Sequence, residues 1–244
     1  MNIEELKDSY KNQRAFIIGN GPSLKLRTLK RLAQTNWATF GMNRIGHWFT
    51  KTDWRPQFYI GFTTAFWDIR HRADILKGIR SAEIAICRES YRDDLKGMDD
   101  NVIYVHCSDT EDMSYDVATN EFWSDDISER VSIFGVMAFP TMQIAAYLGF
   151  NPLFLIGCDG GYRPPVDGID LSHFDPNYRP FDAYPNYDYD ELNRALLRAH
   201  DISQVAADRL GIEIINLSSI SVIEAHKFMN LDRILNAGAR RANE

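Results

Sequence analysis

The sequence has little cysteine, and its three cysteines contain no C-x-x-C pair. An odd number at such spacing favours reduced thiols over a disulfide or zinc framework. Long hydrophobic runs are also missing, since the stretch Pro152–Cys158 is far shorter than the roughly 20 residues that span a bilayer. Residues 1–14 are charged and lack the apolar core of a signal peptide. We therefore expect no transmembrane segment and a cytoplasmic location.

A positive charge excess is absent as well. The chain holds 27 Lys and Arg against 34 Asp and Glu, which gives a net charge of −7 at pH 7. Proteins that bind nucleic acid without sequence preference need a basic surface, so we expect no nucleic-acid partner. Hydrophobic residues make up 45% of the 244 residues, enough for a core without a stabilising metal or disulfide. We predict a single domain over residues 1–244.

Short apolar runs alternate with amphipathic stretches along most of the chain. This alternation is typical of an α/β fold in which helices connect the strands of a parallel sheet. The pattern predicts a mostly parallel sheet of about seven strands flanked by helices. The expected strands are 15–18, 37–41, 57–61, 83–87, 102–106, 153–156 and 212–217. The expected helices are 25–34, 67–79, 136–148, 191–210 and a short C-terminal one.

Residues 160–190 interrupt this alternation. They hold five of the nine prolines and five of the eleven tyrosines. The segment starts directly after the strand 153–156, at the sheet edge where ligands bind in open α/β folds. Its aromatic content argues against plain disorder, and we expect a lid or substrate loop inserted in the domain. The residues in it that we expect to contact substrate are Tyr162, Arg163, Asp175, Tyr178 and Arg179.

A glycine-containing loop follows the first expected strand and precedes a helix. Glycines let the backbone approach a phosphate, and the first amides of a helix favour an anion. The loop lacks the third glycine of G-x-G-x-x-G, and no GK[ST] follows, so it is neither a dinucleotide fingerprint nor a P-loop. A nucleotide site and a tight turn in which Ser23 caps the helix both remain open. The residues that would hold a nucleotide here are Gly19, Asn20, Gly21, Pro22 and Ser23.

Three further polar residues are candidates. Asn43 comes just after the second expected strand, which places it at the same sheet edge as Asn20. Asp159 ends the strand 153–156, where a carboxylate either holds a sugar hydroxyl or a metal-bound water, or caps the next turn. His173 lies within the segment 160–190 and takes a proton near neutral pH, although many loop histidines are simply exposed. Asp159 and His173 are the catalytic candidates.

Taken in order, these segments resemble the bacterial sialyltransferases of the Campylobacter lipooligosaccharide type. They also resemble the related MptE-like group, named after archaeal 6-hydroxymethylpterin diphosphokinases. The similarity covers roughly residues 14–235 and rests on six segments, 19–24, 135–141, 145–150, 155–159, 172–178 and 216–218. It implies a Rossmann-like domain with a lid after the Gly-x-Asp strand.

The resemblance also assigns roles to residues. Asn20 and Asn43 match nucleotide-contacting asparagines of the sialyltransferases. Gly135 and Val136 stand where those enzymes carry a Thr-Ser-Gly segment, and we include them in the nucleotide site. The catalytic histidine of those enzymes lies closer to the following helix than His173 does. A third family asparagine is replaced in the segment 61–63.

Three functions follow from the resemblance. The first is a glycosyltransferase of surface-polysaccharide synthesis with a CMP-linked, sialic-acid-like or Kdo-like donor, a glycan acceptor, no required cofactor and no metal. Asp159 would then lie at the donor–acceptor junction, and His173 would be the general base. The alternative is a pyrophosphokinase that uses Mg²⁺ and ATP on 6-hydroxymethyl-dihydropterin, with Asp159 and one of Asp167, Asp170 or Asp175 holding the metal. The third is a non-catalytic nucleotide- or glycan-binding module, and a homo-oligomer is compatible with each.

Overall fold

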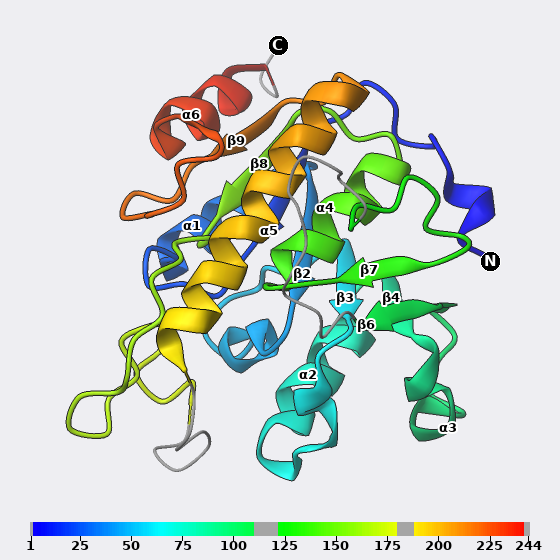
Figure 1. The fold of residues 1–244 in the computed structure, drawn as a ribbon, viewed down its shortest axis with the longest axis horizontal. Helices are drawn as coiled ribbons and strands as arrows, with labels where there is room; N and C mark the ends of the chain where they lie inside the picture. Colours follow the sequence, from blue (N-terminus) through cyan, green and yellow to red (C-terminus); the bar gives the residue numbers. More distant parts are fainter. Residues whose placement is uncertain (1, 110–121, 180–187, 242–244) are drawn as a thin grey trace.

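An eight-stranded, entirely parallel sheet forms the centre of the protein (Figure 1). The structure is a computed structural model that describes residues 2–109, 122–179 and 188–241. The strand order is β10-β9-β8-β1-β2-β3-β4-β5. In chain order these strands are β1 Ala15–Ile18, β2 Ala38–Met42, β3 Phe58–Gly61, β4 Ile84–Arg88, β5 Val102–Val105, β8 Leu153–Ile156, β9 Ile214–Asn216 and β10 Lys227–Phe228.

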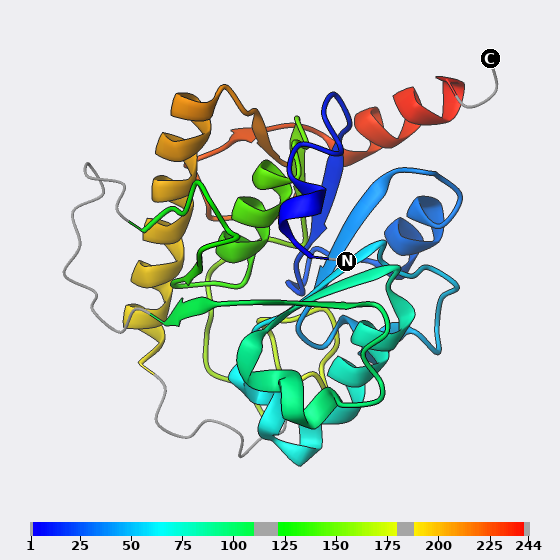
Figure 2. The same ribbon diagram turned by 90° about the vertical axis from the view of Figure 1, so that its right-hand side faces the viewer.

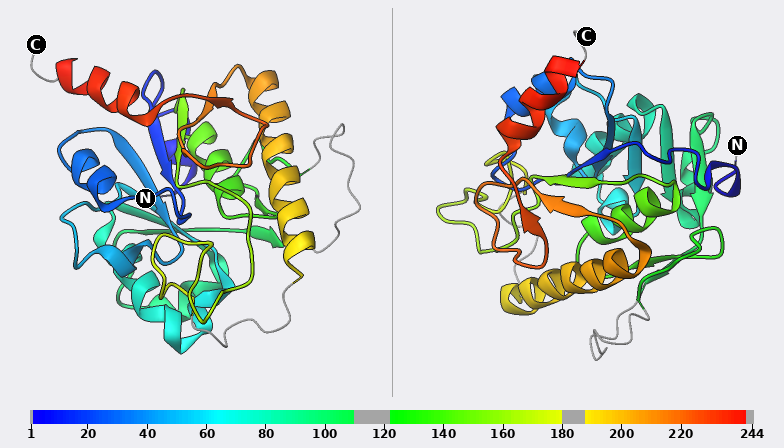
Figure 3. Two further views of the ribbon diagram at one scale, coloured as in Figure 1. Left: turned by 90° about the vertical axis from the view of Figure 1, so that its left-hand side faces the viewer. Right: turned by 90° about the horizontal axis from the view of Figure 1, so that it is seen from above.

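Helices cover both faces of this sheet (Figures 2 and 3). On one face lie α4 (Ala138–Tyr147) and α5 (Tyr189–Leu210), whose apolar side chains share a core with the sheet. On the other face lie α1 (Leu26–Leu32), α2 (Ile69–Ser81) and α6 (Leu231–Arg241). The shorter helices are α3 Arg92–Leu95, η1 Glu4–Leu6, η2 Ile45–Trp48, η3 Thr64–Trp67 and η4 Glu89–Tyr91.

The central strands are largely apolar because both of their faces are buried. In β1, Ala15 and Ile17 belong to the core beneath α4 and α5. Phe16 and Ile18 belong to the core beneath α1 and α2. All four side chains are fully buried. This three-layer arrangement confirms the predicted Rossmann-like α/β fold.

The functional edge of the sheet lies between β1 and β8. The chain leaves β1 toward α1 on one face, whereas the connection after β8 leads to α5 on the opposite face. Neighbouring parallel strands whose connections part in this way leave a crevice at their carboxyl ends, where ligands bind in such folds. The strand order therefore brings the loop after β1 beside the loop after β8.

Two parts of the architecture were not expected from the sequence. The main sheet gains β10, whose Lys227 and Phe228 are exposed, so no buried apolar run marks it. A separate parallel pair joins β6 (Cys107–Asp109) to β7 (Val131–Ile133). Strands of two or three residues are too short to show a hydrophobic period, which is why the sequence pattern did not reveal them.

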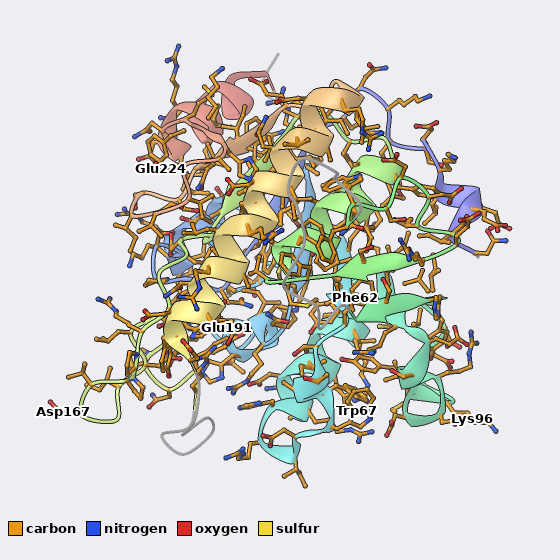
Figure 4. The ribbon with its side chains drawn as sticks, in the orientation of Figure 1. Phe62, Trp67, Lys96, Asp167, Glu191 and Glu224 are labelled. Atoms are coloured by element: carbon orange, nitrogen blue, oxygen red, sulfur yellow. The ribbon has the colours of Figure 1, made fainter. Side chains whose placement is uncertain are left out.

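The expected lid, 160–190, is described for residues 160–179 and 188–190, and residues 180–187 lie outside the described part. Its outer turn holds Asp167, labelled in Figure 4, where a single antiparallel bridge joins Val166 and Ile169. The segment returns to the sheet edge, where the Phe174 N–H donates to the Asn20 carbonyl oxygen at 2.9 Å. Residues 188–190 belong to the start of α5, with Asp188 capping the Glu191 N–H at 2.9 Å.

Gly135 lies where the loop before α4 packs closely against α5. Its φ is +62°, and an added Cβ would collide with the Ala195 carbonyl oxygen in α5. Gly211 has a similar φ of +68°, but a Cβ there meets nothing within 4 Å. We expect Gly211→Ala to lower the free energy of unfolding by about 1–2 kcal/mol through backbone strain alone.

Gly135→Ala should cost more than Gly211→Ala, because the steric clash with α5 adds to the same strain. Urea unfolding of both variants and of the wild type measures the difference. An equal loss of unfolding free energy in the two variants would show that α5 makes no steric clash with a side chain at position 135.

Candidate functional site

A small cavity lies at the carboxyl edge of the sheet, between the loops that follow β1 and β8. Its volume is about 50 Å³. The predicted site residues that line it are Gly19, Asn20, Gly21, Asn43, Val136, Asp159, Tyr162 and His173. Residues that the sequence did not single out for this site complete the walls, among them Met137, Ser172, Leu196 and His200. The lining comes from seven separate chain segments, around residues 19–21, 42–43, 136–138, 157–162, 172–173, 196–200 and 223.

Glycines let the two loops touch. The Gly21 N–H donates to the Gly157 carbonyl oxygen at 2.8 Å. A Cβ on Gly21 would collide with the Asp159 carboxylate, and one on Gly19 would collide with the Gly157 carbonyl oxygen. The sequence predicted that these glycines would admit a phosphate. In the structure these glycines allow the loops after β1 and β8 to pack closely against each other.

Asp159 is held from the side of the β1 loop. Its Oδ2 accepts a hydrogen bond from the Ser23 N–H at 2.7 Å, and its side chain is almost completely buried. Burial raises the pKa of Asp159, and hydrogen bonds from Ser23 offset part of that effect. The expected helix cap at Ser23 is wrong, because Lys25 occupies the N-cap position of α1 and makes no side-chain cap bond.

Three oxygen atoms of cavity-lining residues have no hydrogen-bond partner among the described residues: Asn20 Oδ1, Asn43 Oδ1 and Asp159 Oδ1. The Asn20 amide is fixed in orientation because its Nδ2 donates to the Met42 carbonyl oxygen at 3.1 Å. A buried acceptor without a partner costs about 1–3 kcal/mol. Three such acceptors around one cavity indicate a ligand that carries N–H or O–H groups.

His173 pairs with a carboxylate that the sequence did not assign to it. Its Nδ1 lies 2.8 Å from Asp170 Oδ2, and its ring stacks on Tyr178 with ring centres 4.1 Å apart. Asp170 accepts a second hydrogen bond from the Ser172 N–H at 2.8 Å. With Nδ1–H donating to a carboxylate, Nε2 keeps a free lone pair, which is the arrangement of a general base.

The environment keeps the His173–Asp170 pair in a defined charge state. Burial lowers the pKa of His173 and outweighs the opposing effect of Asp170. Burial raises the pKa of Asp170, but the hydrogen bonds from His173 and Ser172 lower it overall. At neutral pH the pair is therefore a neutral imidazole beside an ionised carboxylate.

The start of α4 forms another wall of the cavity, through Val136, Met137 and Ala138. Met137 is at the N-cap position and offers no side-chain cap hydrogen bond. The first N–H groups of a helix attract anions. This wall therefore suits a phosphate or carboxylate group.

Other predicted contacts lie outside the cavity. Asp175 accepts hydrogen bonds from Trp48 Nε1 at 3.0 Å and from Lys51 Nζ at 2.9 Å. Burial raises the pKa of Asp175, yet these hydrogen bonds hold it well below its usual value. Tyr178 is anchored by Arg44, which donates to its carbonyl oxygen and, through the backbone N–H, to its hydroxyl at 3.2 Å. Both residues attach the segment 160–179 to η2.

The remaining predicted site residues also do not line the cavity. The Arg179 guanidinium lies 5.4 Å from the centre of the Tyr162 ring, and Arg163 Nη2 donates to the Leu171 carbonyl oxygen at 3.3 Å. Pro22, Ser23 and Gly135 support the loops behind the cavity wall. Their expected roles in binding stay predictions.

The carboxylates of the magnesium alternative do not gather at one point. Asp170 faces His173, Asp175 faces Lys51, and Asp167 lies at the outer turn. Within residues 2–109, 122–179 and 188–241, no three His, Cys, Asp or Glu side chains are arranged to hold a metal ion. The magnesium alternative, which needs Asp159 and one further carboxylate, stays a prediction.

Two buried histidines contact each other at one side of the cavity. His200, on α5, lines the cavity, and His200 Nδ1 is 2.9 Å from His226 Nε2. Burial lowers the pKa of His200 well below its usual value and that of His226 to about 4. A histidine within a long amphipathic helix gives no sequence signal of which ring it will meet, so this pair was missed.

Comparison by sequence finds no matching family model and no matching curated protein. Solved structures do match. The Maf glycosyltransferase from Magnetospirillum magneticum AMB-1 is 16% identical, with a TM-score of 0.56 over 99% of this chain. This chain spans 41% of that protein's length.

Two sialyltransferases from Campylobacter jejuni match as well. CstII, solved with the substrate analogue CMP-3FNeuAc, is 14% identical, with a TM-score of 0.53 over 89% of this chain and 86% of that one. The monofunctional α-2,3-sialyltransferase Cst-I is 15% identical, with a TM-score of 0.50 over 89% of this chain and 80% of that one. At these identities the likeness shows a shared fold. The MptE-like part of the resemblance stays a prediction.

No helix in the described residues has both the length and the apolar character needed to cross a membrane.

The buried histidines make stability depend on pH. Unfolded His226 binds a proton near its ordinary pKa of about 6.5, whereas folded His226 stays neutral down to about 4. Unfolding is therefore favoured as the pH falls below about 6.5, and this residue alone lowers the free energy of unfolding by about 2 kcal/mol between pH 7 and pH 5. Urea unfolding at both pH values should show a smaller drop for His226→Gln than for the wild type. Equal drops would mean that His226 is charged in the folded protein.

Proposed function

We propose that the protein is a glycosyltransferase that uses a CMP-linked, sialic-acid-like or Kdo-like donor in surface-polysaccharide or glycoconjugate synthesis. The observation that carries the proposal is the His173–Asp170 pair, whose histidine lines the same cavity as the three residues with unpartnered oxygens. A base, a hydrogen-bonding site and an anion-favouring helix start are the parts that transfer from a nucleotide sugar requires. The shared fold with sialyltransferases supports the same class of activity.

In this proposal the nucleotide binds across the loop after β1. Asn20 Oδ1 and Asn43 Oδ1 accept hydrogen bonds from its hydroxyl or amino groups. The backbone around Gly21 and the start of α4 hold its phosphate and the donor carboxylate through N–H groups. These local dipoles supply the positive potential that the overall charge of −7 does not.

The transfer step uses His173 as the general base. Nε2 takes the proton of the acceptor hydroxyl as that oxygen forms a bond to the anomeric carbon of the donor. The bond from the anomeric carbon to the phosphate oxygen breaks, and CMP leaves with the electron pair. Asp170 stays ionised and stabilises the imidazolium that forms. Asp159 Oδ1 accepts a hydrogen bond from a sugar hydroxyl at the junction of donor and acceptor.

The cavity must widen before a nucleotide enters. Ligand sites of drug size hold about 300–1,000 Å³, whereas this cavity holds about 50 Å³. The segment 172–178 forms its cover, through the Phe174–Asn20 backbone bond and the contacts of Asp175 and Tyr178 with η2. Displacing this segment also displaces His173, so the base reaches its place only when the segment returns over bound substrate. Closure of this kind excludes water from the reaction.

The His173 role predicts a split between turnover and binding. His173→Gln should lower turnover by about 10²–10⁴-fold and leave CMP affinity nearly unchanged, because the base acts only in the transition state. Asp170→Asn should also lower turnover, since an amide no longer enforces the Nδ1–H tautomer. CMP release from a CMP-sugar measures turnover, and thermal shift measures affinity. Full turnover in His173→Gln would show that His173 is not the base, whereas CMP binding without CMP release in the wild type would favour the non-catalytic binding module.

The nucleotide itself is tested by thermal stabilisation against CMP, CDP, UDP, GDP and ATP, each with and without Mg²⁺. A ligand at 100 times its Kd adds about 2.7 kcal/mol to the free energy of unfolding. We expect stabilisation by CMP that does not depend on Mg²⁺. Stabilisation by Mg²⁺ and ATP alone would contradict the proposal and support the pyrophosphokinase alternative. The absence of any shift would contradict both enzyme functions.

A further inference from the structure

We propose that His200 is a second ligand-contacting residue of this cavity, whose Nε2 accepts a hydrogen bond from a hydroxyl or amino group of the bound nucleotide sugar. The inference rests on the proposed function for the identity of that ligand. His200 lies on α5, apart from the segment that carries His173. The residue is 1% exposed and lines the cavity.

A chain of hydrogen bonds runs along α5 and ends at His200. Gln204 Nε2 donates to Asp208 Oδ1 at 2.7 Å. His226 Nδ1 lies 2.8 Å from Gln204 Oε1, and His226 Nε2 lies 2.9 Å from His200 Nδ1. His200, Gln204 and Asp208 are four residues apart, which places them on one face of the helix.

These hydrogen bonds fix which nitrogen atom of each histidine carries a hydrogen. The Asp208 carboxylate only accepts, so the amide nitrogen of Gln204 must face it and the amide oxygen must face His226. His226 Nδ1 therefore carries a hydrogen, which leaves a lone pair on His226 Nε2. His200 Nδ1 must donate to that lone pair. The remaining nitrogen, His200 Nε2, is left as a bare acceptor.

His200 Nε2 has no hydrogen-bond partner among the described residues, although Nδ1 is fully engaged. Burial favours the neutral ring. A neutral ring nitrogen with a lone pair repels phosphate and carboxylate oxygens and attracts N–H and O–H groups. His200 therefore selects the uncharged, hydrogen-donating part of a ligand, whereas the start of α4 favours its anionic part.

The two cavity histidines have different tasks. His173 belongs to a segment that must move for substrate to enter, and it takes a proton in the transition state. His200 belongs to a 22-residue helix and its proton positions are fixed by three neighbours. A hydrogen bond that is equally strong in the bound substrate and in the transition state changes KM and leaves kcat unchanged.

Two variants separate ligand contact from structural support. In His200→Asn the side-chain amide replaces Nδ1 and still donates to His226, but the acceptor at Nε2 is lost. In His200→Gln the amide reaches the place of Nε2, but the bond to His226 is lost. We expect His200→Asn to weaken binding of CMP-3FNeuAc about tenfold and raise KM with little change in kcat. His200→Gln should keep the affinity within about threefold.

A purely structural role predicts the opposite order, with His200→Asn unaffected and His200→Gln impaired, and that result would overturn the inference. Unchanged affinity in both variants would also overturn it. If both lose affinity, the decision rests on the imidazole ¹⁵N NMR spectrum of the wild type. The His200 signals should show the Nδ1–H form, with Nε2 shifting when CMP-3FNeuAc binds.

An Nε2 signal that does not respond to the bound analogue would refute the contact. Binding of CMP-3FNeuAc to the wild type is measured first. Failure at that step counts against the proposed donor, whereas wild-type binding with an unresponsive His200 counts against this inference alone.

Discussion

The site depends on the close approach of the two loops that follow β1 and β8. Both strands lie at the middle of the sheet, and their connections leave toward opposite faces. The Gly21–Gly157 backbone bond closes the gap between the loops, and only glycine permits it. This contact buries Asp159 against the Ser23 amide and places Asn20 at the cavity wall. A side chain at Gly21 would separate the loops and dismantle the site.

The cavity is lined by oriented hydrogen-bonding groups and backbone dipoles rather than by an excess of charged side chains. Acceptors from the two asparagines, Asp159 and the two histidines belong to residues that line the cavity, and the start of α4 forms another part of its wall. A nucleotide sugar carries both hydrogen donors and anionic groups, and in the proposed function its phosphate would be recognised by backbone dipoles instead of by a cluster of basic side chains. Such a site is compatible with the acidic composition of the chain.

In the proposed function, the segment 160–179 links access to the cavity with catalysis. Arg44 is held by Asp74 at 2.8 Å and in turn holds Tyr178, whose ring stacks on His173. The same segment closes the cavity and carries the Asp170–His173 pair. In the proposed function, opening of this segment would remove His173 from the cavity and closing would return it. His200 would keep its place during this movement because it lies on α5.

The sequence by itself determined the α/β fold, since strands buried on both faces must be largely apolar, and each expected strand appears within about two residues. It also determined which residues share the sheet edge, because parallel strands all end there; Asn20, Asn43 and Asp159 were found in this way. Only the tertiary structure decided which side chains meet. Asp170 pairs with His173 inside an aperiodic loop, and His200 pairs with a histidine 26 residues away. Asp175 and Tyr178 turned toward η2 instead of the cavity. Periodicity tells which face of an element a side chain occupies, but the partner on that face is set by the packing of distant segments.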